Sequence, residues 1–171
     1  MVMDFAIRIV FYLIPMYFAN SSAMVLGGKT PIDFGAKWGD GRPVFGRGKT
    51  FKGLFAGVAM GTIAALAASA LFPAETGLLS GQYLLLGFLL ALGAILGDMA
   101  GSFVKRRMGM EQGKPAFFLD QLDFVAGGAI LSLPVYSPSP AELAIIIITT
   151  LIVHRLSNYI AYKAKLKKVP W

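Results

Sequence analysis

Long, almost uncharged apolar segments constrain this chain more than any other feature. Four of them, residues 3–26, 53–72, 83–104 and 141–162, reach the roughly 20 residues that a helix needs to cross a bilayer. A shorter apolar segment covers residues 119–133. The whole chain is 56% hydrophobic and 15% charged, whereas soluble domains are about 45–50% apolar and 25% charged. We therefore predict a single all-α integral membrane domain over residues 1–171, with five transmembrane helices.

Basic residues are confined to alternate connections between these segments. Loops 27–52 and 105–118 contain six and four Lys or Arg residues, and connections 73–82 and 134–140 contain none. Because cytoplasmic loops carry the excess of Lys and Arg, both basic loops are expected in the cytoplasm. Five spans then place the N-terminus outside and the C-terminus in the cytoplasm, with a polar cavity open to the cytoplasm.

The end of segment 83–104 carries polar residues at helical spacing. Asp98, Ser102 and Lys105 are separated by four and three residues, which places them on one helix face. Arg106 lies at the edge of that face. An ionisable residue in a membrane helix indicates a functional site. Ordinary positive-inside residues are the alternative interpretation of the two cations.

Two further acids, Asp120 and Asp123, begin segment 119–133 on a common face. Folding of the hairpin is expected to bring them to Asp98. Three carboxylates without thiolate or clustered histidine suit a hard ion such as Mg²⁺. With flanking cations, Mg²⁺ suits phosphoryl or nucleotidyl transfer. The alternative for Asp120 and Asp123 is a helix-capping role.

The basic loop contains a Gly48-Lys49-Thr50 sequence that is typical of phosphate loops. A Walker A loop also needs a glycine at position 43, which is proline here, so we reject that motif. A glycine-rich basic loop can still present N–H groups and lysines to phosphates, or else bind lipid headgroups. The net charge of +7 predicts an anionic partner, either membrane lipids or a phosphorylated substrate.

Two of these blocks resemble the CTP-dependent phosphatidate cytidylyltransferases. Their GDxxxSxxKR signature matches Gly97 to Arg106, and their later acidic element matches Asp120-Gln121-Leu122-Asp123. The chain lacks their glycine-histidine-glycine-glycine element and has Gln121 where they have arginine. With its five-span length and its 31–53 loop, it is more similar to the shorter CDP-archaeol synthase family.

That resemblance implies transfer of CMP from CTP to an archaeal ether-lipid phosphate of the 2,3-bis-geranylgeranylglycerol 1-phosphate type. It implies Mg²⁺, release of pyrophosphate and CDP-archaeol as product, in a cell membrane with the site on the cytoplasmic side. CTP, the lipid phosphate and membrane lipids are the expected partners, with no nucleic acid; the pattern predicts no particular oligomer.

The predicted site residues fall into three groups. Asp98, Asp120 and Asp123 are assigned to the metal and to catalysis. Phosphate contacts are assigned to Ser102, Lys105, Arg106 and Lys114, of which Lys105 and Lys114 are also assigned to catalysis. The nucleotide side is assigned to Asn20, Lys49, Thr50 and Lys52. Two alternatives remain: another lipid-phosphate transferase, or a small ion-coupled transporter that uses Asp98.

Overall fold

The structure is a computed structural model that describes residues 2–163 and 165, and their only regular elements are helices. In chain order these are α1 (Val2–Val25), α2 (Phe51–Leu71), α3 (Pro73–Gly77), α4 (Tyr83–Arg107), α5 (Leu119–Ser132) and α6 (Pro140–Lys163). The five longer helices begin and end within three residues of the predicted segments. The short helix α3 was not predicted; it begins at Pro73, a residue favoured in the first turn of a helix.

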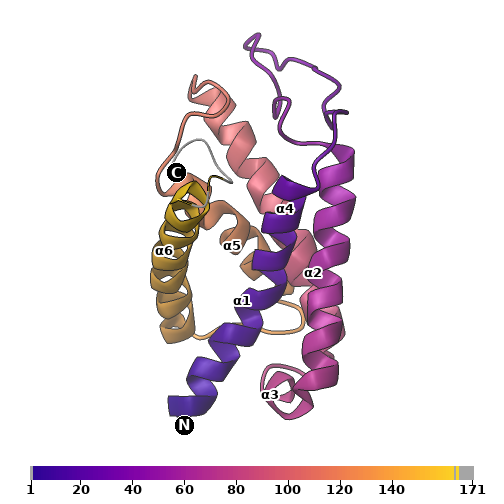
Figure 1. Cartoon of the computed structure of the whole chain (residues 1–171), viewed down its shortest axis with the longest axis vertical. Helices are drawn as coiled ribbons and strands as arrows, with labels where there is room; N and C mark the ends of the chain where they lie inside the picture. Colours follow the sequence, from indigo (N-terminus) through magenta and orange to yellow (C-terminus); the bar gives the residue numbers. More distant parts are fainter. Residues whose placement is uncertain (1, 164, 166–171) are drawn as a thin grey trace.

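The helices run alternately up and down, so the connections gather at two ends of a bundle (Figure 1). The loop between α1 and α2 and the loop between α4 and α5 lie at one end, which we call the loop end. Helix α3, the start of α1 and the start of α6 lie at the other end. All basic loops of the described chain therefore share one end, as the charge pattern predicts.

The all-helical membrane architecture is confirmed, but the count of five spans is not. Helices α1, α2, α4 and α6 are long and apolar enough to cross a membrane. Helix α5 has 14 residues and is about 21 Å long, which is less than the roughly 30 Å of a bilayer core. The orientation in the membrane stays a prediction, and both chain ends lie outside the described residues.

Glycines bring α4 and α5 into direct backbone contact. A Cβ atom placed on Gly97 would lie 2.2 Å from the backbone oxygen of Asp123, and one on Gly127 would lie 2.2 Å from the backbone oxygen of Gly93. Small residues allow this approach in membrane helices, where apolar burial alone does not drive association. The contact fixes Asp123 against the polar end of α4.

Helix α2 packs against α1 and α4 in the same way. A Cβ on Gly61 would lie 2.5 Å from the Cβ of Ala91 and 2.7 Å from the backbone oxygen of Pro15. The small residues of α2 thus allow a close approach of the helices.

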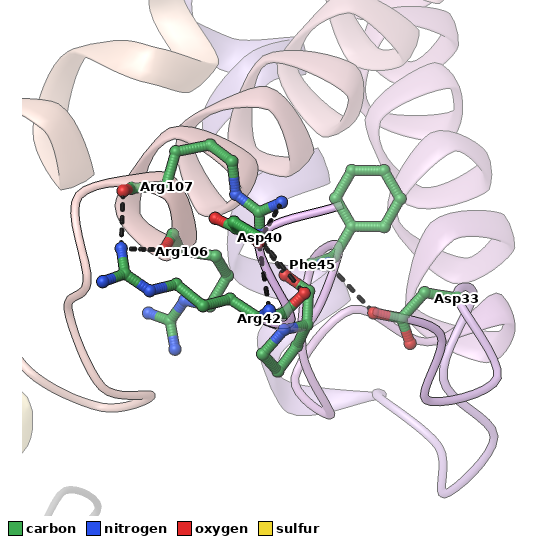
Figure 2. A network of polar contacts seen from close by, with 7 residues as sticks. Asp33, Asp40, Arg42, Phe45, Arg106 and Arg107 are labelled. Atoms are coloured by element: carbon green, nitrogen blue, oxygen red, sulfur yellow. Dashed lines mark hydrogen bonds and ion pairs between the residues drawn. The ribbon is translucent and has the colours of Figure 1, made fainter. Parts of the chain in front are cut away.

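The loop between α1 and α2 folds back on itself and docks on the end of α4. Isolated bridges join Pro31 to Thr50 and Lys37 to Pro43. The Arg42 Nη1 donates to the backbone oxygen of Arg107 at 2.7 Å, as Figure 2 shows. This docking closes one side of the space between α1 and α4.

Candidate active site

A cavity of about 810 Å³ lies at the loop end, between α1, α4, α6 and the two basic loops. Helix α1 contributes Tyr17, Asn20, Ser21 and Met24, whose spacing of three, one and three residues defines one helix face. The buried residues of α1 lie in its middle, from Ile9 to Ala19. The same helix therefore contributes to the core along its middle and to the cavity wall toward the loop end.

The polar face predicted on α4 forms the opposite wall. Asp98, Ser102, Lys105 and Arg106 all line the cavity. Ser102 and Arg106 are buried in the wall. Their placement follows from the helical period, so the expected common face is confirmed.

Two of the predicted acids are paired with lysines of the site. The Lys49 Nζ, from the glycine-rich loop, lies 2.5 Å from the Asp98 Oδ2. Lys105 forms an ion pair with Asp120, and the other oxygen of Asp120 accepts the N–H of Ala116 at 2.8 Å. Asp120 thus holds the loop before α5 against α4.

The third acid, Asp123, lies beneath the cavity wall. A Cβ on Gly101 would lie 2.1 Å from the Asp123 Oδ2, so the carboxylate occupies the space that a side chain at position 101 would fill. This oxygen is buried, and the described residues supply no hydrogen-bond partner for it. Asp98 is near enough to repel it electrostatically.

These positions differ from the predicted arrangement, in which all three acids lie together around a metal ion. Within residues 2–163, no three Asp, Glu or His side chains lie together in an arrangement that could hold a metal ion. Helix α5 places Asp120 on Lys105 instead of beside the other two acids. The Asp123 Oδ2 has no described hydrogen-bond partner, and it lies near Asp98, whose Oδ2 is paired with Lys49. Together the two carboxylates offer the hard oxygen donors that a divalent metal prefers. Assignment of all three acids to a metal stays a prediction.

Arg106 is the most unusual cation of the site. It is only 6% exposed, and its Nε has no hydrogen-bond partner among the described residues. No described carboxylate lies within ion-pair distance of its guanidinium. A buried charge without a counter-ion is costly. An anion bound at this wall of the cavity would supply the missing counter-ion.

The charge balance of the whole cavity points the same way. Its lining includes five basic side chains, those of Arg47, Lys49, Lys105, Arg106 and Lys114, and two acidic ones, those of Asp98 and Asp120. An excess of three cations in a partly enclosed space favours a multiply charged anion.

Comparison with known proteins decides the family. The chain matches the CarS-like family, described as CDP-archaeol synthase, over residues 2–171. It is 46% identical to the CDP-archaeol synthase of Pyrococcus abyssi over 162 residues, which cover 94% of this chain and 95% of that protein. It is 41% identical to that of Methanocaldococcus jannaschii over 169 residues, covering 94% of each chain. The chain belongs to the CDP-archaeol synthase family.

A solved structure supports the same assignment. It is described as an intramembrane enzyme for archaeal membrane lipid biosynthesis, and it matches with a TM-score of 0.79 at 38% identity. The match covers 87% of this chain and 91% of that one. As a member of the CDP-archaeol synthase family, the chain is an enzyme of the CTP-dependent cytidylyltransferase class.

Within this family member, the residues predicted for the nucleotide side have different positions. Asn20, Lys49 and Thr50 line the cavity. Thr50 is also the N-cap of α2, because its Oγ1 accepts the N–H of Gly53 at 3.1 Å and that of Gly28 at 3.0 Å. Its hydroxyl is therefore already used by the fold.

Lys52, assigned to the nucleotide side, and Lys114, assigned to phosphate contacts and catalysis, differ in their relation to the cavity. Lys52 is not among the described cavity residues; its stem packs over Gly28, where a Cβ would lie 2.9 Å from that of Lys52. The rotation of α2 after its cap turns this side chain away from the cavity. Lys114 does line the cavity, but it is exposed and pairs with Glu111 at 3.1 Å.

Sequence reasoning missed several cavity residues. Arg47 and Gln112 come from different loops, and the backbone N–H of Arg47 donates to the Gln112 Oε1 at 3.2 Å. Only the fold brings these loops together, so no local pattern reveals the contact. Tyr17 and Ser21 could have been found, because with Asn20 they form a polar helical face inside an apolar segment. His154, which was not assigned to the site, also lines the cavity.

Proposed function

We propose that this enzyme transfers CMP from CTP to the phosphate of an archaeal ether lipid of the 2,3-bis-geranylgeranylglycerol 1-phosphate type. The products are CDP-archaeol and pyrophosphate. The observation that carries the proposal is the buried, unpaired Arg106 in a cavity whose lining has three more cations than acids. Family membership makes CTP the expected polyanion.

The reaction is a displacement at the α-phosphorus of CTP. An oxygen of the lipid phosphate forms a new P–O bond, the bond between the α-phosphorus and its bridging oxygen breaks, and pyrophosphate leaves with that electron pair. A phosphate monoester is already anionic near neutral pH, so no strong general base is needed. The residues of the site act by positioning the reactants and by offsetting their charge.

The cavity residues divide between these tasks. Arg106 and Lys105 lie one helix turn beyond Ser102 on α4 and would hold the phosphates of CTP. Lys49 reaches the same space from the glycine-rich loop. Because lysine and arginine carry fixed charge and donate hydrogen bonds to phosphate oxygens, they would stabilise negative charge that moves to the leaving pyrophosphate.

A divalent metal, Mg²⁺ in our proposal, would be held by Asp98 and Asp123. Cytidylyltransferases generally use a divalent metal. Such an ion, when bound, neutralises triphosphate oxygens. Asp120 has a distinct role in this proposal: its ion pair with Lys105 orients that cation.

In this proposal the lipid reaches the site along α1. A second, apolar cavity of about 410 Å³ lies between α1 and α2, lined by residues such as Phe18, Val25 and Met60. It shares Tyr17 and Ser21 with the polar cavity. One apolar chain could therefore rest between these helices while the phosphate reaches the cations, which supports a lipid as the acceptor.

The loop end faces the cytoplasm in this proposal. Cysteines introduced at Lys29 and Met110 should react only with a reagent on the cytoplasmic side, and one at Ser137 only with a reagent outside. The physical reason is the excess of Lys and Arg in loops 27–52 and 105–118. Labelling of cysteines at Met110 and Ser137 from the same side would show that the α5 segment does not cross the membrane.

The activity is tested with purified protein, radiolabelled CTP and a panel of lipid phosphates. We expect a radiolabelled CDP-lipid that requires both the ether-lipid phosphate and Mg²⁺, and that is lost on chelation. CTP replaced by other nucleoside triphosphates, and the lipid phosphate replaced by its dephosphorylated alcohol, serve as controls. Ion transport without any CDP-lipid would instead favour the transporter alternative.

A further inference from the structure

Asp33 fixes the backbone of the loop between α1 and α2 from within. Its Oδ2 accepts the N–H groups of Phe45 and Gly46, both at 2.9 Å, and its Oδ1 accepts that of Gly35 at 3.0 Å. Figure 2 shows the bond from Phe45. Burial raises the pKa of the Asp33 carboxyl, but the N–H donors outweigh burial and hold the pKa below its ordinary value. The group is therefore ionised at neutral pH.

The segment held by Asp33 is the turn that carries Lys49. Within the turn, the N–H of Lys49 donates to the backbone oxygen of Gly46 at 3.2 Å, and the N–H of Ile32 donates to that of Lys49 at 2.8 Å. Consecutive residues, Ile32 and Asp33, thus hold the two ends of the turn. Gly46 has φ +93°, a conformation that other residues rarely adopt, so the turn has a specified shape.

The turn places Lys49 so that its side chain reaches α4 across the cavity. Its Nζ lies 2.5 Å from the Asp98 Oδ2, and both side chains line the cavity. Asp33 itself is not among the described residues that line the cavity. Any influence of Asp33 on the reaction must therefore pass through the turn.

We propose that Asp33 is a positioning residue for cytidylyl transfer, which holds the Gly46–Lys49 turn so that the Lys49 ammonium meets the CTP phosphates beside Asp98. This inference rests on the proposed function, because it takes the cavity as the CTP site. A lysine has a long flexible stem, so its use as a fixed phosphate contact requires a rigid backbone. Gln112 supports the turn from outside, but by one bond from an exposed side chain.

The test is a double-mutant cycle of Asp33→Asn and Lys49→Ala. Asn keeps the shape of Asp but has only one acceptor oxygen for the three N–H groups. We expect Asp33→Asn to weaken CTP binding about 10-fold by calorimetry and to raise the KM for CTP, with the KM for the lipid unchanged. In the Lys49→Ala background the same change should have almost no further effect, because the affected group is already absent.

Asp40→Asn is the matched control. Asp40 lies in the same loop, accepts the N–H of Arg42 at 3.0 Å and pairs with Arg107 at 3.2 Å, but it does not contact the Gly46–Lys49 turn. We expect CTP binding within about twofold of the wild type, since surface pairs contribute little. Gly46→Ala disrupts the turn in a second way. Its effect on CTP binding should also disappear in the Lys49→Ala background, which keeps the test available if Asp33→Asn folds poorly.

Two results would overturn the inference. The first is additivity of Asp33→Asn or Gly46→Ala with Lys49→Ala, which would show a general effect on the fold. The second is an equal rise in the KM for CTP and for the lipid. If the wild type binds CTP and the variants show the expected coupling, but no CDP-lipid forms, the proposed function fails while the role of Asp33 in positioning Lys49 for CTP binding stands. A wild type that binds no CTP would overturn both.

Discussion

The two ends of the bundle each contain a polar cluster, but they differ in whether the buried charges have described counter-ions. At the end opposite the loops, Glu142 at the start of α6 accepts hydrogen bonds from the Tyr136 hydroxyl at 2.8 Å and the Ser139 N–H at 2.7 Å. It also pairs with Arg8 at 3.3 Å. Nearby, the hydroxyls of Tyr12 and Ser132 share a hydrogen bond of 2.7 Å.

The loop end is different in its charge balance. Its cavity has an excess of three cations, and it includes Arg106 without a described counter-ion and, behind the wall, the unpartnered oxygen of Asp123. Ionisable side chains near a membrane helix end thus have two uses. Side chains that have protein partners, as Glu142 does, join helices. Side chains that lack protein partners can bind a ligand.

The largest expected effect is that of Asp98→Asn. Asn has nearly the shape of Asp but lacks the charge that attracts a metal ion, so CMP transfer should fall by about 100-fold or more. The thermal midpoint should stay near that of the wild type. Radiolabelled CDP-lipid formation measures the loss, and a double change with Asp123→Asn should be little worse than the worse single change. Retention of most Mg²⁺-dependent turnover would contradict the metal assignment.

Arg106→Met should separate function from stability. Loss of a hydrogen-bonded charge should cost about 1.5–3 kcal/mol of substrate binding, or about 10- to 150-fold in kcat/KM for CTP. Because an unpaired buried charge is replaced by an apolar chain, the thermal midpoint should stay equal or rise.

The matched control for Arg106 is Arg107→Met on the next position of α4. Arg107 contacts Asp40, the backbone oxygen of Pro43 and the ring of Phe103, and it does not line the described cavity. It should therefore lose stability and keep its CTP kinetics. A reversed pattern for the two arginines would show that Arg106 is structural.

Glu142→Gln should lower stability and leave activity unchanged, the opposite of the result expected for Arg106→Met. The change removes the charge that pairs with Arg8 and leaves an amide donor facing the Tyr136 hydroxyl, so stability should fall by about 1–3 kcal/mol. Activity per folded molecule should be unchanged, because Glu142 is in the first turn of α6, and the start of α6 lies at the end opposite the two loops that line the cavity (Figure 1). Glu75→Gln on α3 is the control at the same end, and denaturation in detergent is the measurement. A loss of kcat without a loss of stability would link the two ends functionally.

The smallest effect is expected for Lys114→Gln. Lys114 and Glu111 are both exposed, with side chains 63% and 77% accessible, and such pairs contribute at most about 1 kcal/mol to stability. A solvent-screened cation at the cavity rim should change kcat/KM by only about two- to fivefold. A larger loss than that of Arg106→Met would mean that the rim, and not the buried wall, binds the phosphates.

Local pattern alone was enough for the five longer helices and for the polar face of α4. Apolar length defines a membrane helix because every backbone polar group in lipid must be bonded within the segment. The period of 3.6 residues then places Asp98, Ser102 and Arg106 on one wall without knowledge of the other helices. The family resemblance at these residues followed from the same short blocks.

Tertiary structure decided which charges meet. Asp98 is paired with Lys49, 49 residues earlier in the chain, and Asp120 with Lys105, whereas the sequence grouped the three acids together. The glycine contact of α4 with α5 sets Asp123 behind the wall, and the cap of α2 turns Lys52 away. Such pairings depend on how closely whole helices approach and on where a loop docks, which no local spacing encodes. The sequence by itself determined the polar wall of α4; the packing determined which other polar groups join it and which of them remain without partners.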